Sequence, residues 1–520
     1  MTTQLDVDHL QAGLRGLAGS AEPTEATMTL IDEGVTGDAL MLIDGELVAS
    51  SSGATFPNVD PTTEEVLGDV ADATPEDLDR AISAARRAFD NTTWASDPEF
   101  RKHCLMQFQA AMVRNADLLR ATAVIEGGIA VRTTNTMHSD AAIGTIPYWA
   151  EMATNYEYER ALPDRPWAYG SRHLIRREAI GVVAAITPWN FPLVTAMTKV
   201  LPALAAGATV ILKPAVQTPW HATLIARLIA EETDFPAGVF NIVTPLDNNV
   251  AELLATDPRV DLIHFTGSTA VGKKLMALAS TRVARVALEL GGKSANIMLP
   301  DVNLEQVVPF AAGMVSLNSG QGCILPTRML VHQDRYDEAV EIVKVTYENM
   351  PFGDPRDPDV VQGPQISELQ RSRILDLVAA GVSEGAQLVT GGAKPAQFEK
   401  GYFVQPTLLA NVDENSTVAQ REIFGPVLSL IPYTDVDDAV RIANNSTYGL
   451  AGYIWSPDED AALGVARRIH SGMLAINGGF FFAPDLPWGG YKQSGIGRES
   501  GVEGFEEFLE TKTLAVGNFR

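Results

Sequence analysis

The chain has 520 residues, which is long for a single hydrophobic core, so two or three domains are expected. Its net charge of −26 repels phosphate backbones and argues against a nucleic-acid partner. Only two cysteines are present, and the N-terminus has no basic region followed by an apolar run, so we expect a cytoplasmic protein without a signal peptide. Prolines, glycine and lysine interrupt the most apolar region, about 179–212, so no membrane span is expected.

The N-terminal part predicts an extension, a hairpin and two helices. Residues 1–36 lack periodicity and are expected to be poorly ordered, with a candidate helix at Leu5–Leu17. Asp38–Ser50 alternates around a turn, as a hairpin does. A helix begins at Thr74-Pro75, and another is expected over about Asp97–Glu126, with Cys104 among its core residues.

From residue 180 onward, apolar strands alternate with helical segments. Strands are expected at Ile180–Ile186, Ala208–Leu212, Val239–Val243, Val260–Phe265 and Arg285–Leu290. This alternation predicts βαβ units and a mostly parallel sheet, which binds ligands beyond the carboxyl ends of its strands. A second α/β block begins near residue 293, with a helix at Leu304–Leu317 and a strand at Met329–His332.

The stretch Asn318-Ser319-Gly320-Gln321-Gly322-Cys323 places a cysteine on a glycine-rich backbone. Glycine lets a backbone pass close to a ligand, so Cys323 is a candidate nucleophile, although most free cysteines are packing residues. Glu289 ends an apolar strand beside two glycines, where burial would raise its pKa into the range of a general base. The alternative for Glu289 is an ion pair with Lys293.

The stretch Gly267–Lys273 has the spacing of a P-loop, but Lys274 stands where magnesium needs Ser or Thr. An NTPase is therefore disfavoured, although a helix N-terminus there could hold a phosphate. A G-x-G-x-x-G fingerprint is absent after the first parallel strand, so any dinucleotide is not held in the usual Rossmann manner. No Cys/His spacing in the sequence indicates a metal site.

Seven stretches, in order over about residues 40–515, resemble the signatures of the aldehyde dehydrogenase superfamily. They are Thr187-Pro188-Trp189-Asn190-Phe191-Pro192, Lys213-Pro214, Phe265-Thr266-Gly267-Ser268, Leu288-Glu289-Leu290-Gly291-Gly292-Lys293-Ser294, the stretch ending in Cys323, Glu422-Ile423-Phe424-Gly425-Pro426, and Pro487–Gly495. Several matches are six or more residues long, so the signal is specific.

The resemblance implies a hydrolytic mechanism. The Cys323 thiolate would attack the aldehyde carbon, and the Asn190 amide with the Cys323 N–H would stabilise the oxyanion. Hydride transfer to NAD would leave a thioester, which water activated by Glu289 would hydrolyse to a carboxylate. CoA-acylating relatives typically lack this Glu. The alternative is a catalytically silent binding or structural protein on the same fold, which the intact Cys323, Glu289, Asn190 and Lys213 argue against.

The resemblance also assigns the cofactor. Lys213 would contact the adenosine ribose, Glu422 the nicotinamide ribose, and Gly267 and Ser268 the pyrophosphate. The nicotinamide end and its cleft would involve Phe424, Trp189 and Thr187. Many NAD-specific members have a Glu three residues after this Lys, where Val216 stands here. We therefore expect NAD and keep NADP as an alternative.

For the substrate, the resemblance implies a tunnel lined by Phe191, Ile324, Phe482 and Trp488. The run Phe480-Phe481-Phe482 predicts an apolar tunnel for an aliphatic or aromatic aldehyde.

The implied fold is α/β, with a Rossmann-like parallel-sheet cofactor domain, an α/β catalytic domain and a small β oligomerisation element for a homodimer or homotetramer. The predicted boundaries are 37–160 with 179–291 for the cofactor domain, 292–496 for the catalytic domain, and 161–178 with 497–520 for the oligomerisation element.

Overall fold

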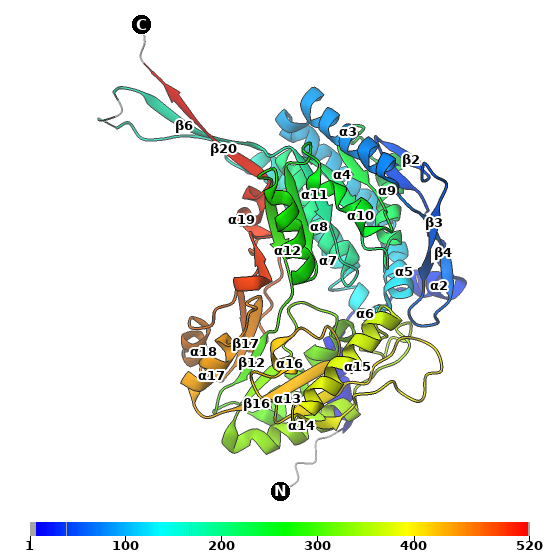
Figure 1. The fold of residues 1–520 in the computed structure, drawn as a ribbon, viewed down its shortest axis with the longest axis vertical. Helices are drawn as coiled ribbons and strands as arrows, with labels where there is room; N and C mark the ends of the chain where they lie inside the picture. The colour runs from blue at the N-terminus through cyan, green and yellow to red at the C-terminus, as the bar shows by residue number, and fades with distance from the viewer. Residues whose placement is uncertain (1–6, 38, 166, 168, 518–520) are drawn as a thin grey trace.

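The computed structural model describes residues 7–37, 39–165, 167 and 169–517. Figure 1 shows two lobes, one above the other, and an arm of β6 and β20 that projects from the upper lobe. The expected α/β fold is confirmed, because each lobe is built on a mostly parallel sheet with helices beside it. No helix in the described ranges is long and apolar enough to cross a membrane.

The upper lobe contains an eight-stranded sheet in the order β19-β11-β10-β7-β8-β9-β1-β2. Its strands are β1 (Met41–Ile43), β2 (Glu46–Val48), β7 (Val182–Ile186), β8 (Thr209–Lys213), β9 (Phe240–Ile242), β10 (Leu262–Thr266), β11 (Arg285–Glu289) and β19 (Gly495–Ile496). The five central strands run parallel, and β1 and β19 join the two sides antiparallel. A separate hairpin pairs β3 (Thr55–Val59) with β4 (Val66–Ala71).

Alternating side chains of these strands enter two different helix layers, because neighbouring residues of a strand point to opposite faces. Val183 and Ala185 of β7 pack with helices α4 (Pro98–Arg114), α7 (Ser139–Asn155), α8 (Pro192–Ala206) and α9 (Trp220–Glu232). Val182 and Ala184 pack with α3 (Pro75–Asn91), α11 (Leu253–Thr256) and α12 (Thr269–Ser280). Strands covered on both faces read as continuous apolar runs, which is how the sequence shows them.

The lower lobe contains a seven-stranded sheet in the order β14-β15-β16-β13-β12-β17-β18. Its strands are β12 (Ala295–Met298), β13 (Arg328–His332), β14 (Gln387–Thr390), β15 (Thr407–Ala410), β16 (Val427–Tyr433), β17 (Ala451–Trp455) and β18 (Met473–Ile476). Its helices are α13 (Leu304–Gly313), α14 (Tyr336–Glu348), α15 (Glu368–Ser383), α16 (Thr417–Gln420), α17 (Val436–Asn444) and α18 (Glu459–Ala466).

The arm is a three-stranded antiparallel sheet in the order β20-β6-β5. Its strands are β5 (Glu159–Ala161), β6 (Arg172–Ala179) and β20 (Leu509–Val516), so the C-terminal strand pairs along the whole of β6. Helix α19 (Gly501–Glu506) leads into β20, and Phe505 and Phe508 pack into the core of the upper lobe. The arm is therefore attached to the upper lobe through buried aromatic rings.

Two expectations about helices need correction. The single helix expected over about Asp97–Glu126 is two helices, because the chain breaks at Asn115 before α5 (Ala116–Gly127). The poorly ordered extension is wrong for the described residues 7–37, which form α1 (Val7–Leu17) and α2 (Glu25–Glu33). The start of the candidate helix, Leu5 and Asp6, lies outside the described residues. Buried leucine and isoleucine side chains hold these helices against the two lobes, and the leucines of α1, Leu10, Leu14 and Leu17, have helical spacing.

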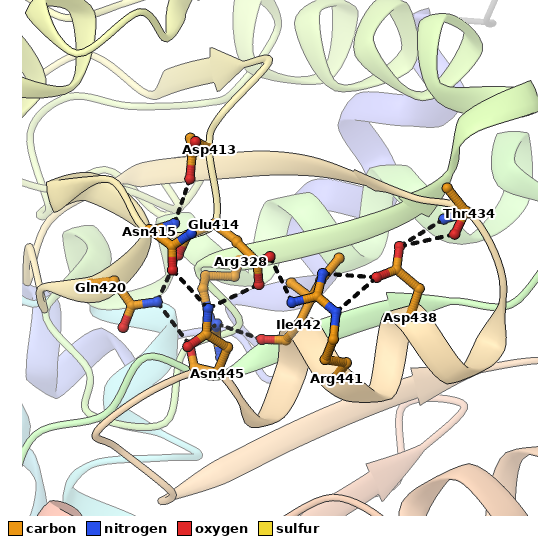
Figure 2. A network of polar contacts seen from close by, with 10 residues as sticks. All are labelled: Arg328, Asp413, Glu414, Asn415, Gln420, Thr434, Asp438, Arg441, Ile442 and Asn445. Atoms are coloured by element: carbon orange, nitrogen blue, oxygen red, sulfur yellow. Dashed lines mark hydrogen bonds and ion pairs between the residues drawn. The ribbon is translucent and has the colours of Figure 1, made fainter.

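Arg328 fixes the chain just after the cysteine loop. Its guanidinium is 1% exposed and donates to four backbone carbonyls: Lys293 O at 2.9 Å, Ile442 O at 3.1 Å, Ala443 O at 2.9 Å and Asn445 O at 3.4 Å. The last three carbonyls belong to the C-terminal end of α17, where a helix leaves carbonyls without internal partners. Figure 2 follows this network outward to Arg441, which pairs with Glu414 and Asp438.

We expect Arg328→Met to lower the free energy of unfolding by about 3 kcal/mol or more, because several buried carbonyls lose their donors. Urea unfolding followed by circular dichroism measures this change. Arg441→Met is the matched control within the same network: its side chain is 57% exposed, so its loss should cost about 0–1 kcal/mol. Equal destabilisation by the two changes would contradict the role given to Arg328.

Candidate active site

A cavity of about 490 Å³ lies where the two lobes meet, and residues of both lobes line it. Asn190 and Glu289 come from the upper lobe, and Cys323 comes from the lower lobe. Asn190 follows β7 and Glu289 ends β11, so both lie at the carboxyl ends of parallel strands, where such sheets bind ligands. The three residues predicted to be catalytic thus line one cavity, although more than 30 residues separate each from the next along the chain.

The backbone before Cys323 adopts a sharp left-handed bend. Asn318, Ser319 and Gly320 have φ values of 48°, 58° and 76°. At Gly320 a Cβ atom would lie 2.0 Å from the carbonyl carbon of Gly425, so only glycine fits. Gly292 has the same constraint, because its Cβ would lie 2.2 Å from the Cys323 carbonyl oxygen. These two glycines let the cysteine loop pass between two other segments.

Hydrogen bonds between the lobes set the position of Asn190. Its side-chain amide donates to the Gln321 carbonyl at 2.9 Å, and Asn318 donates in return to the Asn190 carbonyl at 2.8 Å. Gln321 is itself held, because its side-chain oxygen accepts from Ile366 N at 2.9 Å. Asn190 is 6% exposed and lines the cavity, so its amide is fixed beside the cysteine loop.

Glu289 is buried and one of its carboxyl oxygens has no hydrogen-bond partner among the described residues. Burial, with a smaller contribution from the Glu499 carboxylate, raises the pKa of Glu289 to about 8. The proposed alternative of an ion pair with Lys293 is not formed, since the Lys293 Nζ has no hydrogen-bond partner in the described structure. Glu289 is therefore a carboxyl group that changes protonation near neutral pH.

A buried ion pair beside Glu289 was missed in the sequence. Lys199 of α8 donates to Glu499 Oε1 at 2.6 Å and to Thr266 Oγ1 at 2.5 Å, and Glu499 and Thr266 line the cavity. Although burial acts to raise the pKa of Glu499, Lys199 and His264 hold it below its usual value. The only available signal was a lysine inside an apolar helix, whose carboxylate partner lies 300 residues away.

The two cysteines have different surroundings. Burial raises the pKa of the Cys323 thiol well above its usual value, and the Glu289 and Glu422 carboxyl groups raise it further. Cys323 is half-buried and lines the cavity, whereas Cys104 is 0% exposed within the core of the upper lobe. Cys104 is thus a packing residue, and Cys323 is the thiol that a ligand in the cavity can meet.

Five of the eight residues expected at the cofactor line this cavity: Gly267, Ser268, Glu422, Phe424 and Trp189. The Glu422 carboxylate accepts from Gly292 N at 2.9 Å, while burial raises its pKa to about 7. The Trp189 and Phe424 rings meet edge to face, with centroids 5.3 Å apart.

The other three cofactor candidates are not among the residues that line the cavity. Thr187 N donates to the Lys213 carbonyl, so these two residues lie at one edge of the sheet. Burial lowers the pKa of the Lys213 ammonium to about 8, and no ion pair of this lysine occurs in the described structure. Val216 packs against the cluster around Trp220. A buried cation without a carboxylate partner suits a ligand with several hydroxyl acceptors.

The P-loop-like stretch does not present its lysines to the cavity. Ser268 caps α12 by accepting from Val271 N at 3.3 Å, so this helix begins at the cavity. Lys273 donates to Gln493 Oε1 at 2.8 Å, and Lys274 pairs with Glu252. The predicted helix start is present. The two lysines make local contacts with neighbouring side chains.

Aromatic side chains form the apolar part of the cavity. The expected tunnel residues Phe191, Ile324, Phe482 and Trp488 all line it, and the Phe482 and Trp488 rings meet edge to face at 5.6 Å. Phe480 also lines the cavity. Phe481 does not, and packs between Tyr453 and Trp488. No cluster of metal-binding side chains occurs in the ranges that the structure covers.

Comparison with known proteins places these features in one family. The sequence model of the aldehyde dehydrogenase family matches residues 47–514. A geranial dehydrogenase of Castellaniella defragrans is 39% identical over 478 residues, which cover 91% of this chain and 98% of that protein.

Two crystal structures have the same fold. The aldehyde dehydrogenase of Mycobacterium tuberculosis, complexed with NAD+, has a TM-score of 0.89 and 39% identity over 94% of this chain and 100% of its own. A cysteine-to-alanine mutant of aldehyde dehydrogenase C from Pseudomonas syringae, complexed with NAD+ and octanal, has a TM-score of 0.87 and 38% identity over 92% of this chain and 96% of its own.

The chain belongs to the aldehyde dehydrogenase family. It is an oxidoreductase that oxidises aldehydes with a nicotinamide cofactor, which confirms the expected activity. A catalytically silent protein on this fold is not supported.

Proposed function

We propose that Cys323, Glu289 and Asn190 carry out a hydrolytic oxidation of an apolar aldehyde with NAD. The observation that carries this proposal is the meeting of the Cys323 thiol, a carboxyl group with an unpartnered oxygen and a fixed amide in one cavity. These groups suit a nucleophile, a base and an oxyanion donor.

In the first half of the reaction, Cys323 attacks the aldehyde carbon. The thiol first releases its proton to solvent, so the thiolate is the attacking form and Glu289 stays deprotonated for the second half of the reaction. The carbonyl oxygen becomes an oxyanion beside the Asn190 amide, and a donor at this place is worth roughly 3–4 kcal/mol. The bond between Asn190 and Gln321 holds the amide in place before the substrate arrives.

In the second half, Glu289 takes a proton from water, which attacks the thioester on Cys323. The carboxylate product leaves, and the thiol is restored. One carboxyl oxygen of Glu289 has no partner among the described residues, so it is available to accept this proton. This use of Glu289 favours hydrolysis over transfer to another thiol.

The side chains at the cavity and the sheet edge suit a dinucleotide, which accepts a hydride at its nicotinamide when bound. Lys213 would hold the adenosine ribose, and Glu422 the nicotinamide ribose. The start of α12 at Gly267 and Ser268 offers backbone N–H groups to the pyrophosphate. Trp189 and Phe424 would line the cleft. Thr187 would lie at the sheet edge, and Val216 near the adenosine ribose that Lys213 would hold.

The aldehyde would enter beside Phe191, Ile324, Phe482 and Trp488. Apolar rings favour an aliphatic or aromatic chain over a charged one, because a buried charge without a partner is costly. The geranial and octanal in the names of two relatives are of this chemical kind.

The arm supports assembly into a homodimer or homotetramer, since β20, β6 and β5 project from the body as a small sheet whose strand edges another chain could extend. We keep the predicted domain boundaries, 37–160 with 179–291, 292–496, and 161–178 with 497–520, as a proposal. Two free cysteines and the strongly acidic surface charge suit a cytoplasmic protein with no nucleic-acid partner.

Replacing Cys323 by Ala should abolish aldehyde oxidation, and Glu289→Gln should retain a burst of one hydride transfer but slow later turnovers by about 10²–10⁴-fold. Wild-type kcat should rise with pH through about 8, where Glu289 loses its proton, and Glu289→Gln should lack this rise. Stopped-flow absorbance of reduced nicotinamide measures both. Steady turnover by Cys323→Ala would contradict the assignment of the nucleophile.

The cofactor proposal predicts higher kcat/KM with NAD than with NADP. Val216 offers no cation to reward a 2′-phosphate. The matched variant Val216→Glu should increase the preference for NAD, because a carboxylate there would bind ribose hydroxyls and repel a phosphate. Steady-state rates with each cofactor decide this, and a preference for NADP above about tenfold, or 1.4 kcal/mol, would exclude the proposal.

For the substrate, kcat/KM should increase along propanal, butanal and hexanal by up to about fourfold for each methylene group, because each buried methylene contributes about 0.8 kcal/mol. Succinic semialdehyde should be a poor substrate, since its carboxylate would meet aromatic rings. A strong preference for succinic semialdehyde or for a phosphorylated aldehyde would refute the apolar channel.

A further inference from the structure

The N-terminal segment, residues 7–37, precedes the part of the chain that the family model matches. The family match begins at residue 47, and the geranial dehydrogenase is covered over 98% of its length while 91% of this chain is covered. The segment has buried side chains, including Leu14 at 1% exposure and Thr27 at 0%. It is therefore an ordered addition whose purpose the family fold does not explain.

The two helices of this segment pack on different lobes. Helix α1 packs on α13 of the lower lobe, and α2 packs on α5 of the upper lobe. Figure 1 shows α2 beside α5, at the edge of the upper lobe. Residues 18–24 between the helices therefore cross from one lobe to the other.

The crossing residues contact one wall of the cavity. Glu22 forms an ion pair with Arg132, and its carbonyl accepts from Asn135 at 3.1 Å. Gly19 lies so close to Thr136 that a Cβ on Gly19 would be 2.9 Å from the threonine methyl group. Thr136 itself lines the cavity.

A chain of polar contacts runs from α2 to the same wall. Thr24 and Thr27 donate to Asp117 at 2.5 and 2.8 Å. Arg120 also donates to Asp117, at 2.8 Å, and its guanidinium bonds both oxygens of Asp140 at 2.9 and 3.0 Å. Asp140, in the first turn of α7, lines the cavity four residues beyond Thr136.

An apolar contact completes the connection. Leu14 and Leu17 of α1 belong to a buried cluster of the lower lobe, and Met137 packs against that cluster. Met137 also lines the cavity. Three independent contacts therefore lead from the N-terminal segment to three neighbouring residues of one cavity wall.

We propose that residues 7–37 form an interdomain clasp that sets the position of the cavity wall at Thr136, Met137 and Asp140, and thereby the length of aldehyde that the channel accepts. This inference rests on the proposed use of the cavity as the aldehyde channel. The clasp acts as a positioning element, because none of its described residues is among those that line the cavity.

Two variants loosen the clasp, and each has a matched control in the same segment. Gly19→Ala forces a side chain against Thr136, whereas Gly34→Ala has the same kind of positive φ, 84°, with nothing within 4 Å. Thr27→Val removes the hydroxyl that bonds Asp117, whereas Thr29→Val changes an exposed threonine of the same helix, which bonds only within that helix.

The measurement is the ratio of kcat/KM for octanal to that for propanal. Gly19→Ala and Thr27→Val should change this ratio by about twofold to tenfold, the range that one hydrogen bond accounts for, while both controls keep the wild-type ratio. A ratio that is unchanged in both variants, or that shifts equally in the controls, overturns the proposal. Should Gly19→Ala fail to fold, Thr27→Val decides.

Hydrogen exchange tests the clasp independently of the proposed function. The backbone N–H groups of Thr133, Asn135 and Met137 are hydrogen-bonded within the contacted segment. They should exchange faster in Gly19→Ala and Thr27→Val than in the controls. Wild-type protein that oxidises no aldehyde would defeat the proposed function, and the exchange rates would still test the clasp. If these N–H groups exchange at the same rate in the variants as in the controls, the segment does not support this wall.

Discussion

The pair of hydrogen bonds that joins Asn190 to the cysteine loop is the contact on which the rest of the site depends. Asn190 Nδ2 donates to the Gln321 carbonyl, and Asn318 Nδ2 donates to the Asn190 carbonyl. Asn190 belongs to the upper lobe, and Asn318 and Gln321 belong to the lower lobe, which carries Cys323. Because the bonds are buried, losing one would leave a polar group unsatisfied, so they hold the two lobes in one register.

The electrostatics of the site follow from the same burial. Glu289, Glu422 and Glu499 lie in or beside one cavity, and burial acts to raise the pKa of each. Of these three carboxyl groups, Glu499 alone forms an ion pair with a lysine in the described structure, and it alone has a pKa below the usual value. Similar side chains therefore acquire different protonation states from their neighbours, which allows one of them to exchange protons near neutral pH.

The strands and the candidate catalytic residues could be predicted from sequence because their signals are local. A strand covered on both faces, such as β7 or β8, is a continuous apolar run, and the glycines near Cys323 mark backbone that other residues cannot adopt. What could not be predicted depends on contacts between distant segments. Lys199 gave no sign of Glu499, 300 residues away, and helix α2 is held by Asp117, 90 residues beyond Thr27.

The C-terminal part of the chain returns to the upper lobe, and this return has a consequence for folding. Strand β19 pairs with β11, and Glu499 reaches Lys199, so the sheet and the buried ion pair need residues near the end of the chain. Contacts of such sequence separation form late, because a long loop must close before they stabilise anything. During synthesis, a chain that has already made both Cys323 and Glu289 still lacks Glu499 and the edge strand. The emerging protein would therefore carry the Cys323 thiol in an unfinished site until translation is almost complete.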